Sequence, residues 1–367
     1  SIARTAKATV IANVLADLDE VINGNYLPAS YDADNKGRIT RWAAMAIKAK
    51  IYLFEGNWTQ VKNITSTIMT EGGFKLFGSY AGLFEIANEY NSEVILDAQY
   101  RPTSREHQMM YAFLPPSLGG YSQLSPLQEL VDSYIMLDGK TIKETGTSFD
   151  ESHPYANRDP RLKATVMYTG NSYTLADGTE VVINCEKGEG KDGYGVGSDC
   201  SATGYYIKKY WDNTYRATLY SGLNPILIRY ADILLMNAEA LAELGELDKT
   251  AWDATIKPIR DRAGFTLASA LEFPEGASKD KLIEIVRNER RSELALEGHR
   301  HKDIIRWRIA DNVLNGWCHG LKTNDVVGTD DGYVRVENRT FNANKHYLWP
   351  IPQAERDLNG NLEQNPN

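Results

Sequence analysis

Hydrophobic residues recur at the three- to four-residue spacing of amphipathic helices in several long segments. Residues 2–23 show this pattern, and so does an alanine-rich segment, 38–54, which predicts a helix that ends before Gly56. A second helix is expected to start at Trp58 and to run to about residue 70, where a glycine pair closes it. The N-terminal part of the chain is therefore predicted to contain a pair of helices joined by a tight glycine turn.

The same unit recurs far along the chain. Residues 227–244 predict a helix rich in small side chains, followed by Gly245, and residues 248–263 predict a second helix that ends at Gly264. Small residues allow two helices to pack closely, and this pattern is typical of tetratricopeptide-type hairpins. Since the two copies are widely separated, they do not form a simple tandem array. A further helical pattern covers residues 279–308.

The segment between the hairpins has a different character. Residues 93–100 predict a strand, and residues 101–226 are rich in Gly, Pro, Tyr, Asn and Asp without a long periodic helix. Short strands are predicted at 163–168, 180–184 and 205–210.

We interpret the chain as one mainly α-helical domain that carries a long loop-rich insertion. Long loops on a rigid scaffold commonly carry recognition sites. The expected parts are helical scaffold hairpins in 1–90 and 227–310, a ligand-facing insertion in 91–226 and an irregular C-terminal part in 311–367.

Composition excludes two classes of protein. The 367 residues have a net charge of −9, which argues against a nucleic-acid partner, because such proteins present a basic face to phosphates. No apolar run approaches the roughly 18 residues that a membrane-spanning helix needs. The 21 tyrosines and 7 tryptophans suit the binding of sugars or peptides, although most aromatic residues in any protein lie in the core.

The three cysteines are Cys185, Cys200 and Cys318. No CxxC pair is present, which excludes a zinc-ribbon site. The first two cysteines enclose a glycine-rich loop, and the sequence leaves open whether they form a disulfide or stay as two thiols.

Common catalytic and cofactor motifs are absent or lack their structural context. Gly188–Gly193 matches GxGxxG, but no strand–turn–helix pattern surrounds it. Asp32 and Asp34 begin like a calcium loop, but Lys36 and Ala43 occupy positions where an EF-hand needs ligands, so only a looser cation site with the two aspartates stays open. No GxSxG, Walker A or HExxH sequence occurs. We therefore predict no cofactor and no metal, and these motifs identify no catalytic residue. A glycosidase-like pair among the 49 acidic residues is neither excluded nor supported by the sequence, because its diagnostic is a spatial separation.

The most distinctive segment is a charged helix. Glu289, Glu293 and Glu297 are spaced four residues apart, and several arginines lie between and beyond them. We interpret this stripe as a structural ion-pair network rather than as catalytic acids. Gly298 would weaken a helix, so it indicates close packing or a helix boundary. His299 and His301 do not share a face and are expected at the surface or in salt bridges.

Four blocks together resemble the SusD-like (RagB/SusD) family of nutrient-binding outer-membrane lipoproteins of Bacteroidetes. Their order and spacing cover nearly the whole chain. They lie at 37–58 (with Lys-Ala-Lys-Ile-Tyr-Leu-Phe-Glu-Gly), at 225–245 followed by 259–264 (with Arg-Tyr-Ala-Asp-Ile-Leu-Leu-Met-Asn-Ala-Glu-Ala), at 288–307 (with Asn-Glu-Arg-Arg-Ser-Glu-Leu-Ala-Leu-Glu-Gly-His-Arg) and at 347–366 (with Tyr-Leu-Trp-Pro-Ile-Pro-Gln-Ala-Glu).

The resemblance implies a function that the residues alone do not. Members have four tetratricopeptide-type hairpins that support a loop-rich half, and they are not enzymes. They lie at the cell surface as a lid on a SusC-like TonB-dependent transporter and deliver oligosaccharides, or in some branches peptides, to it. The lipid-bearing cysteine that anchors them in the outer membrane, and the first helices, are expected upstream of Ser1.

Because the matching blocks are scaffold, the binding residues must be argued from chemistry. A sugar needs an exposed aromatic ring against its CH face and polar groups around its rim. The densest cluster of such side chains is predicted after the strand at 205–210, and a second lies between Arg101 and Tyr121. The candidates are Tyr210, Trp211, Asp212, Asn213, Tyr215 and Arg216 in the first cluster, and Arg105, Tyr111 and Tyr121 in the second, with His107, Gln108 and Tyr194 nearby.

Alternatives remain at this stage. For Trp211 and Tyr215, the sequence supports two roles equally: contact with a ligand, or packing of the loop onto the helices. Trp42, Trp58 and Trp307 are expected in the core. The leading functional hypothesis is non-catalytic capture of oligosaccharides. The others are peptide binding in a groove, a glycoside hydrolase with two carboxylates about 5–10 Å apart, and a tetratricopeptide scaffold for protein partners.

Overall fold

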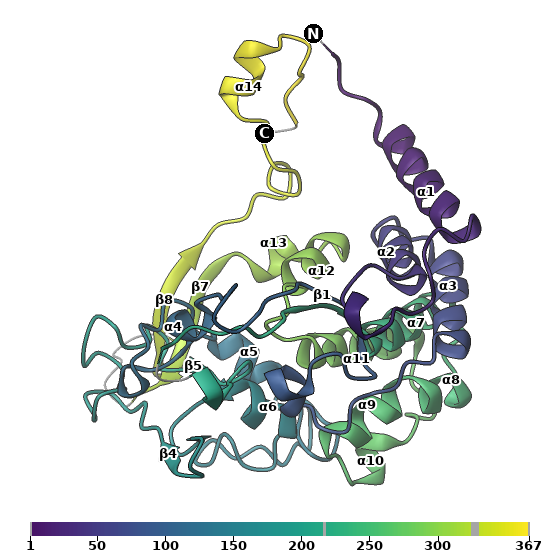
Figure 1. Ribbon diagram of the computed structural model, residues 1–367. Helices are drawn as coiled ribbons and strands as arrows, with labels where there is room; N and C mark the ends of the chain where they lie inside the picture. The colour runs from purple at the N-terminus through teal and green to yellow at the C-terminus, as the bar shows by residue number, and fades with distance from the viewer. Residues whose placement is uncertain (1, 216–217, 324–329, 366–367) are drawn as a thin grey trace.

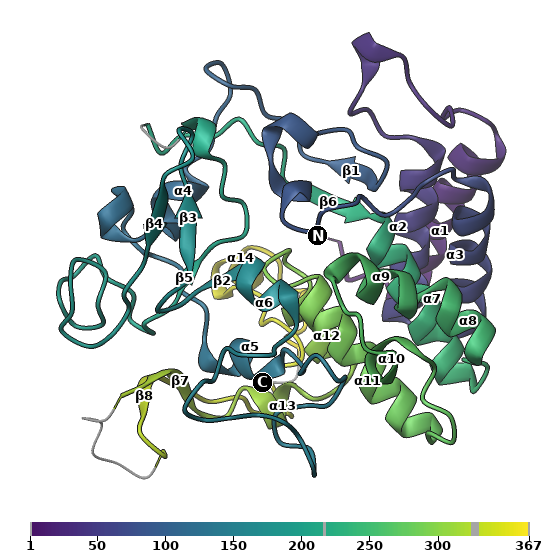
Figure 2. The same cartoon turned by 90° about the horizontal axis from the view of Figure 1, so that it is seen from below.

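Helices gather on one side of the molecule and loops with short strands on the other (Figures 1 and 2). The structure is a computed structural model that describes residues 2–215, 218–323 and 330–365. The helical side contains α1 (Lys7–Asn23), α2 (Arg41–Phe54), α3 (Trp58–Glu71), α7 (Tyr230–Leu244), α8 (Lys249–Ala254), α9 (Ile256–Ala263), α10 (Ala268–Leu271) and α11 (Lys279–Glu293).

The two predicted hairpins pack against each other through α3 and α7. Thr40 caps the start of α2, because its hydroxyl accepts the Ala43 N–H, and Gly56 takes a left-handed φ of 68° in the turn to α3. Most of α7 is buried, and Asn237 donates from its amide to the Thr65 hydroxyl of α3 at 2.9 Å. The predicted mainly helical scaffold with tight helix turns is thus confirmed.

The helices differ from the sequence prediction at three boundaries. The helix predicted from 227 begins only at Tyr230, because the apolar run before it forms β6 (Ile226–Arg229), antiparallel to β1 (Val94–Asp97). The helix predicted at 248–263 is broken at Thr255, because Pro258 has no N–H for the carbonyl four residues earlier. Residues 2–6 precede α1 and are not helical.

The predicted long helix at 279–308 is also interrupted. Helix α11 ends at Glu293, and α12 (Arg300–Arg306) follows after a turn in which Gly298 has a φ of 79°. A Cβ on Gly298 would meet no atom within 4 Å, so this glycine marks a helix boundary and not a close contact. His299 lies in the turn; burial lowers its pKa to about 4.

The loop-rich side has its own core around Tyr134, Tyr173 and Tyr206. The strand predicted at 163–168 is mainly helical there, since α6 occupies Pro160–Thr165 and only two residues continue as β2. The elements of this side are α4 (Met109–Phe113), α5 (Gln128–Ser133), α6, β2 (Val166–Met167) paired with β5 (Tyr206–Ile207), and β3 (Ser172–Thr174) paired with β4 (Glu180–Val182), all antiparallel.

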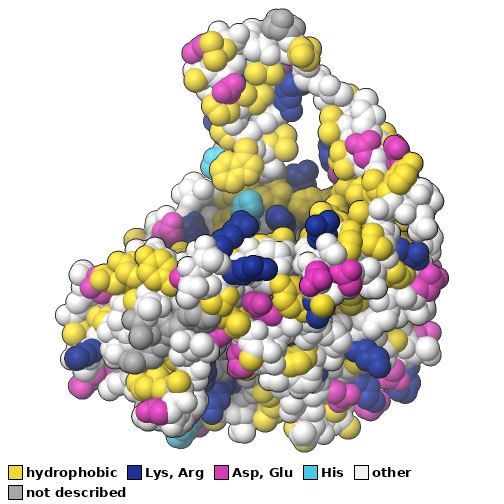
Figure 3. All heavy atoms as spheres, viewed as in Figure 1, with side chains coloured by type: hydrophobic (Ala, Val, Ile, Leu, Met, Phe, Trp, Pro, Cys, Tyr) yellow, Lys and Arg dark blue, Asp and Glu magenta, His cyan; other side chains and the backbone are white. Residues whose placement is uncertain are grey.

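The C-terminal part contains more regular structure than the sequence predicted. After α13 (Ala310–Val313), strands β7 (Gly316–Lys322) and β8 (Tyr333–Arg339) form an antiparallel pair within the segment that was expected to be irregular. Beyond β8 an arm with α14 (Gln353–Leu358) projects from the body (Figure 1). The Arg4 guanidinium donates to the side-chain oxygen of Asn365 at 2.9 Å. The face between this arm and α1 is hollowed, and cationic and hydrophobic side chains gather on its floor (Figure 3).

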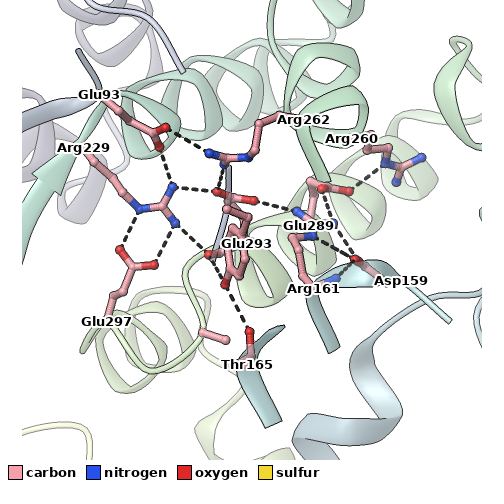
Figure 4. Close-up of polar contacts among 12 residues, drawn as sticks. Glu93, Asp159, Arg161, Thr165, Arg229, Arg260, Arg262, Glu289, Glu293 and Glu297 are labelled. Carbon is pink, nitrogen blue, oxygen red and sulfur yellow. Dashed lines mark hydrogen bonds and ion pairs between the residues drawn. The ribbon is translucent and has the colours of Figure 1, made fainter. Parts of the chain in front are cut away.

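A buried ion-pair network joins the two sides (Figure 4). At the end of α11, Glu293 accepts hydrogen bonds from Arg161 of α6 at 2.8 Å, from Arg229 of β6 at 2.6 Å and from Arg262 of α9. The network continues through Glu93, Asp159, Arg260, Glu289, Glu297 and Lys209. The predicted structural role of the glutamate stripe is confirmed, because all three side chains are buried and paired with cations.

Candidate functional site

The first predicted cluster, residues 210–216, is partly directed inwards. Tyr210 is only 7% exposed, its ring packs on Phe84 with centroids 5.1 Å apart, and its hydroxyl donates to the Leu296 carbonyl at 3.1 Å. The buried Asp212 carboxylate accepts the backbone N–H of Ile86 at 2.9 Å and of Thr214 at 2.9 Å. In this structure both side chains fix the course of the loop and do not line a surface.

The next residues of the cluster contact strand β3. The Trp211 indole donates to the Thr174 carbonyl at 3.0 Å, and its ring lies 5.0 Å from that of Tyr173. Asn213 reaches the same carbonyl at 3.5 Å. Packing against the loop-rich core therefore accounts for Trp211. The side chain of Tyr215 and the whole of Arg216 lie outside the described part of the chain.

The second predicted cluster presents an aromatic surface. The rings of Tyr111 and Tyr121 are stacked, with centroids 4.1 Å apart and an angle of 25° between their planes. Tyr121 is 41% exposed, and its N–H donates to the Tyr111 carbonyl at 2.9 Å, which fixes the two residues side by side. We call this feature the tyrosine pair.

Arg105 lies in a different feature, a concavity of about 290 Å³ that we call the tyrosine–arginine groove. The groove adjoins a second concavity of about 220 Å³, since Lys36 and Tyr90 line both. Its lining residues come from three distant segments: Ala33, Asp34 and Lys36; Tyr90; and Gln99, Tyr100, Arg101 and Arg105.

A buried asparagine holds the two tyrosines of the groove in place. The Asn224 side chain accepts the Tyr100 N–H at 2.6 Å and donates to the Tyr90 hydroxyl at 3.3 Å. The Tyr90 hydroxyl in turn donates to Gln99 at 2.6 Å. Tyr90 has a left-handed φ of 58°, which is strained for a residue with a bulky side chain and persists only where its surroundings enforce it.

Cations cover the rings of both groove tyrosines. The Lys36 ammonium lies 5.6 Å from the centroid of Tyr90, and the Arg105 guanidinium lies 5.3 Å from that of Tyr100. The rings of Tyr100 and His107 are nearly perpendicular, with centroids 4.8 Å apart, and His107 Nε2 lies 2.9 Å from the Leu223 carbonyl oxygen. The groove therefore combines aromatic surface with fixed hydrogen-bonding groups, which is the chemistry that recognises saccharides.

Most of the groove residues were not predicted from the sequence. Lys36, Tyr90 and Asn224 stand in segments without a dense aromatic–polar cluster, and only the fold brings them to Tyr100 and Arg105. A usable signal is the run from Tyr100, the last residue of the predicted strand, to Arg105, because loops at strand ends often carry binding residues.

Other predicted features have structural partners. The three cysteines are free thiols, and Cys200 lies 3.2 Å from the Lys191 carbonyl oxygen, so the disulfide is not formed in this structure. Asp32 caps a short helix by accepting the Asn35 N–H at 3.1 Å. Tyr194 is half-buried against the loop-rich core. Among the described residues, no three His, Cys, Asp or Glu side chains come together as a metal site would require.

A larger concavity, of about 660 Å³, lies between α5, α12, α13 and β7. Its wall is mainly apolar, with Leu294, Ile304 and Trp317, and it includes Arg291 and Arg300. None of the described residues that line it is a tyrosine. This concavity is the principal competitor of the groove as a binding site.

The chain belongs to the SusD family, whose sequence pattern matches residues 83–367. SusD-like protein P25 of Formosa agariphila is 27% identical over 335 residues, which cover 85% of this chain and 57% of that protein. A SusD-like carbohydrate-binding protein from Bacteroides fragilis has a crystal structure that is 29% identical, with a TM-score of 0.85, covering 99% of this chain and 72% of that one. The chain thus spans little more than half the length of the first of these relatives.

The fold is shared more widely than the sequence. Surface glycan-binding protein A from Bacteroides thetaiotaomicron is 20% identical, with a TM-score of 0.62 over 98% of this chain. In the part of the chain that the structure describes, no helix has the length and apolar character needed to cross a bilayer.

Proposed function

We propose that the protein binds oligosaccharides without catalysis at the cell surface and delivers them to a SusC-like TonB-dependent transporter. The observation that carries the binding proposal is the tyrosine–arginine groove, in which buried contacts hold Tyr90 and Tyr100 at an open concavity. The tyrosine pair adds a second aromatic surface. The carbohydrate-binding relative from Bacteroides fragilis supports the same ligand class.

Tyr90→Ala is expected to weaken oligosaccharide binding by about tenfold or more, because central aromatic contacts contribute most of the affinity of such sites. Calorimetry with a panel of oligosaccharides and peptides measures this loss. Phe54→Ala is the matched control, since Phe54 is an exposed aromatic residue on α2, outside the groove.

Three outcomes of this panel would count against the proposal. Unchanged affinity in Tyr90→Ala would remove the groove from the site. Binding of peptides in place of saccharides would favour the peptide-binding branch of the family. Release of new reducing ends that persists after repurification would contradict non-catalytic binding.

Delivery to a transporter makes a separate prediction. The protein is labelled at the surface of intact cells of the bacterium that produces it. After mild detergent extraction, it is expected to co-purify with a SusC-like barrel in roughly equal amounts. Recovery without such a barrel, or labelling only after the cells are lysed, would contradict this part of the proposal. The binding measurement above does not depend on it.

A further inference from the structure

We propose that the tyrosine–arginine groove selects acidic saccharides, that is, oligosaccharides that carry carboxylate or sulfate groups. This inference rests on the proposed saccharide-binding function and adds the chemical class of the ligand. It is carried by the arrangement of Lys36, Arg101 and Arg105 around the two groove tyrosines.

The cations of the groove have no acidic partner. Among the described residues, no carboxylate lies within 4.0 Å of the side-chain nitrogens of Lys36, Arg101 or Arg105. Arginines elsewhere in the fold do have acidic partners. Arg161, Arg229 and Arg290 each contact at least two carboxylates. A protein with a net charge of −9 therefore concentrates unpaired positive charge at this groove, which attracts anions.

The two arginines are held close together by the backbone. Arg101 and Arg105 face each other in an antiparallel bridge, with N–H to carbonyl distances of 2.8 and 3.0 Å. Side chains that face each other in such a bridge emerge on the same side, and like charges in this arrangement destabilise it. A carboxylate or sulfate between the guanidinium groups would convert that repulsion into two attractive contacts, and guanidinium groups bind such anions with paired N–H donors.

The acidic side chains near the groove form hydrogen bonds with neutral groups. Asp97 is buried, accepts an amide N–H of Asn224 at 3.1 Å, and has a pKa that burial raises. Glu89 accepts the Asn224 backbone N–H at 2.7 Å, and Glu106 accepts that of Thr103 at 2.9 Å. These carboxylates accept hydrogen bonds from neutral amide groups, so they leave the positive charge of the groove uncompensated. Within the described part of the chain, Asp34 is the single acid that lines the groove.

The rings themselves distinguish the groove from the tyrosine pair. A neutral sugar stacks its CH face on a bare ring, but Lys36 and Arg105 lie over Tyr90 and Tyr100. An anionic group can bind to these cations while they keep their contacts with the rings. The tyrosine pair has no cation over it among the described contacts and suits a neutral sugar residue.

The test compares ligands that differ only in charge. Calorimetry would use oligogalacturonides and their fully methyl-esterified forms, and sulfated oligosaccharides with their desulfated counterparts, against wild type, Arg105→Gln and Arg101→Gln. Arg308→Gln is the matched control, because Arg308 lies over Tyr347 at 4.5 Å outside the groove. We expect at least one charged ligand to bind about tenfold more tightly than its neutral form.

The variants then locate this preference. Arg105→Gln and Arg101→Gln are each expected to reduce the ratio of affinities for charged and neutral ligand about fivefold or more, whereas Arg308→Gln leaves this ratio unchanged. Equal affinity for charged and neutral forms would overturn the inference while leaving saccharide binding intact. Preference that survives both groove variants would also overturn it. If no saccharide of either kind bound, the proposed function itself would fail.

Discussion

Replacing Glu293 with glutamine is expected to lower the free energy of unfolding by about 3–5 kcal/mol, the usual effect of removing one partner from a buried ion pair. Glu293 accepts from Arg161, Arg229 and Arg262, and each of these side chains is almost completely buried. A neutral amide would leave three guanidinium groups with less negative charge and would place N–H donors against one another. Urea denaturation measures the change.

A matched control lies on the same helix. Glu284 of α11 is exposed, and its ion-pair partner among the described residues is Lys281 at 3.3 Å, so Glu284→Gln is expected to change stability by less than about 0.5 kcal/mol. A loss below about 1 kcal/mol in Glu293→Gln would show that the network does not hold the two sides of the molecule together. Because Arg161 belongs to α6 and Arg229 to β6, Glu293 ties both of these elements to α11 of the helical side.

The second large effect is a loss of stability in acid. Burial alone would raise the pKa of Glu297, but Arg229 and Lys209 outweigh burial and hold that pKa at about 2, below its ordinary value of 4.5. The pKa values of Glu289 and Glu293 are lowered in the same way by the arginines around them, against the effect of burial. A carboxyl group with a lowered pKa in the folded state stabilises that state fully above the unfolded pKa and stops doing so as it becomes protonated.

The free energy of unfolding is therefore expected to fall between pH 4.5 and about pH 2, with about 3 kcal/mol from Glu297 alone. Urea titrations at closely spaced pH values measure the slope. In Glu297→Gln the same curve should be flatter in this window, although its plateau at neutral pH is lower. A slope that is identical in wild type and Glu297→Gln would contradict the assignment of the acid sensitivity to this network.

The sequence predicts the helical scaffold well because its signals are local. Helices α2 and α3 have apolar periodicity, a capping residue and a closing glycine, and all three act within a few residues. The sequence does not predict the boundary at β6, because that boundary depends on a distant partner strand. The run Ile-Leu-Ile-Arg at 226–229 has no period that separates a buried strand from a helix, and its pairing with β1 is a long-range contact.

The sequence indicates the acidic residues of the ion-pair network but not their partners. The spacing of Glu289, Glu293 and Glu297 indicates acids that act together, but their partners Arg161 and Arg229 lie far away in the chain. The same limit applies to the candidate site. Local density of aromatic residues favoured 210–216, where Tyr210 and Asp212 are buried, whereas the groove assembles Lys36, Tyr90 and Tyr100 from segments that meet only in the fold.

The most direct test of saccharide capture at the groove is a crystal structure of the protein with the oligosaccharide that binds most tightly in the panel. The account predicts ligand density in the tyrosine–arginine groove, in contact with Tyr90, Tyr100 and Arg105. Density in the 660 Å³ concavity between α12 and β7, with an empty groove, would contradict it.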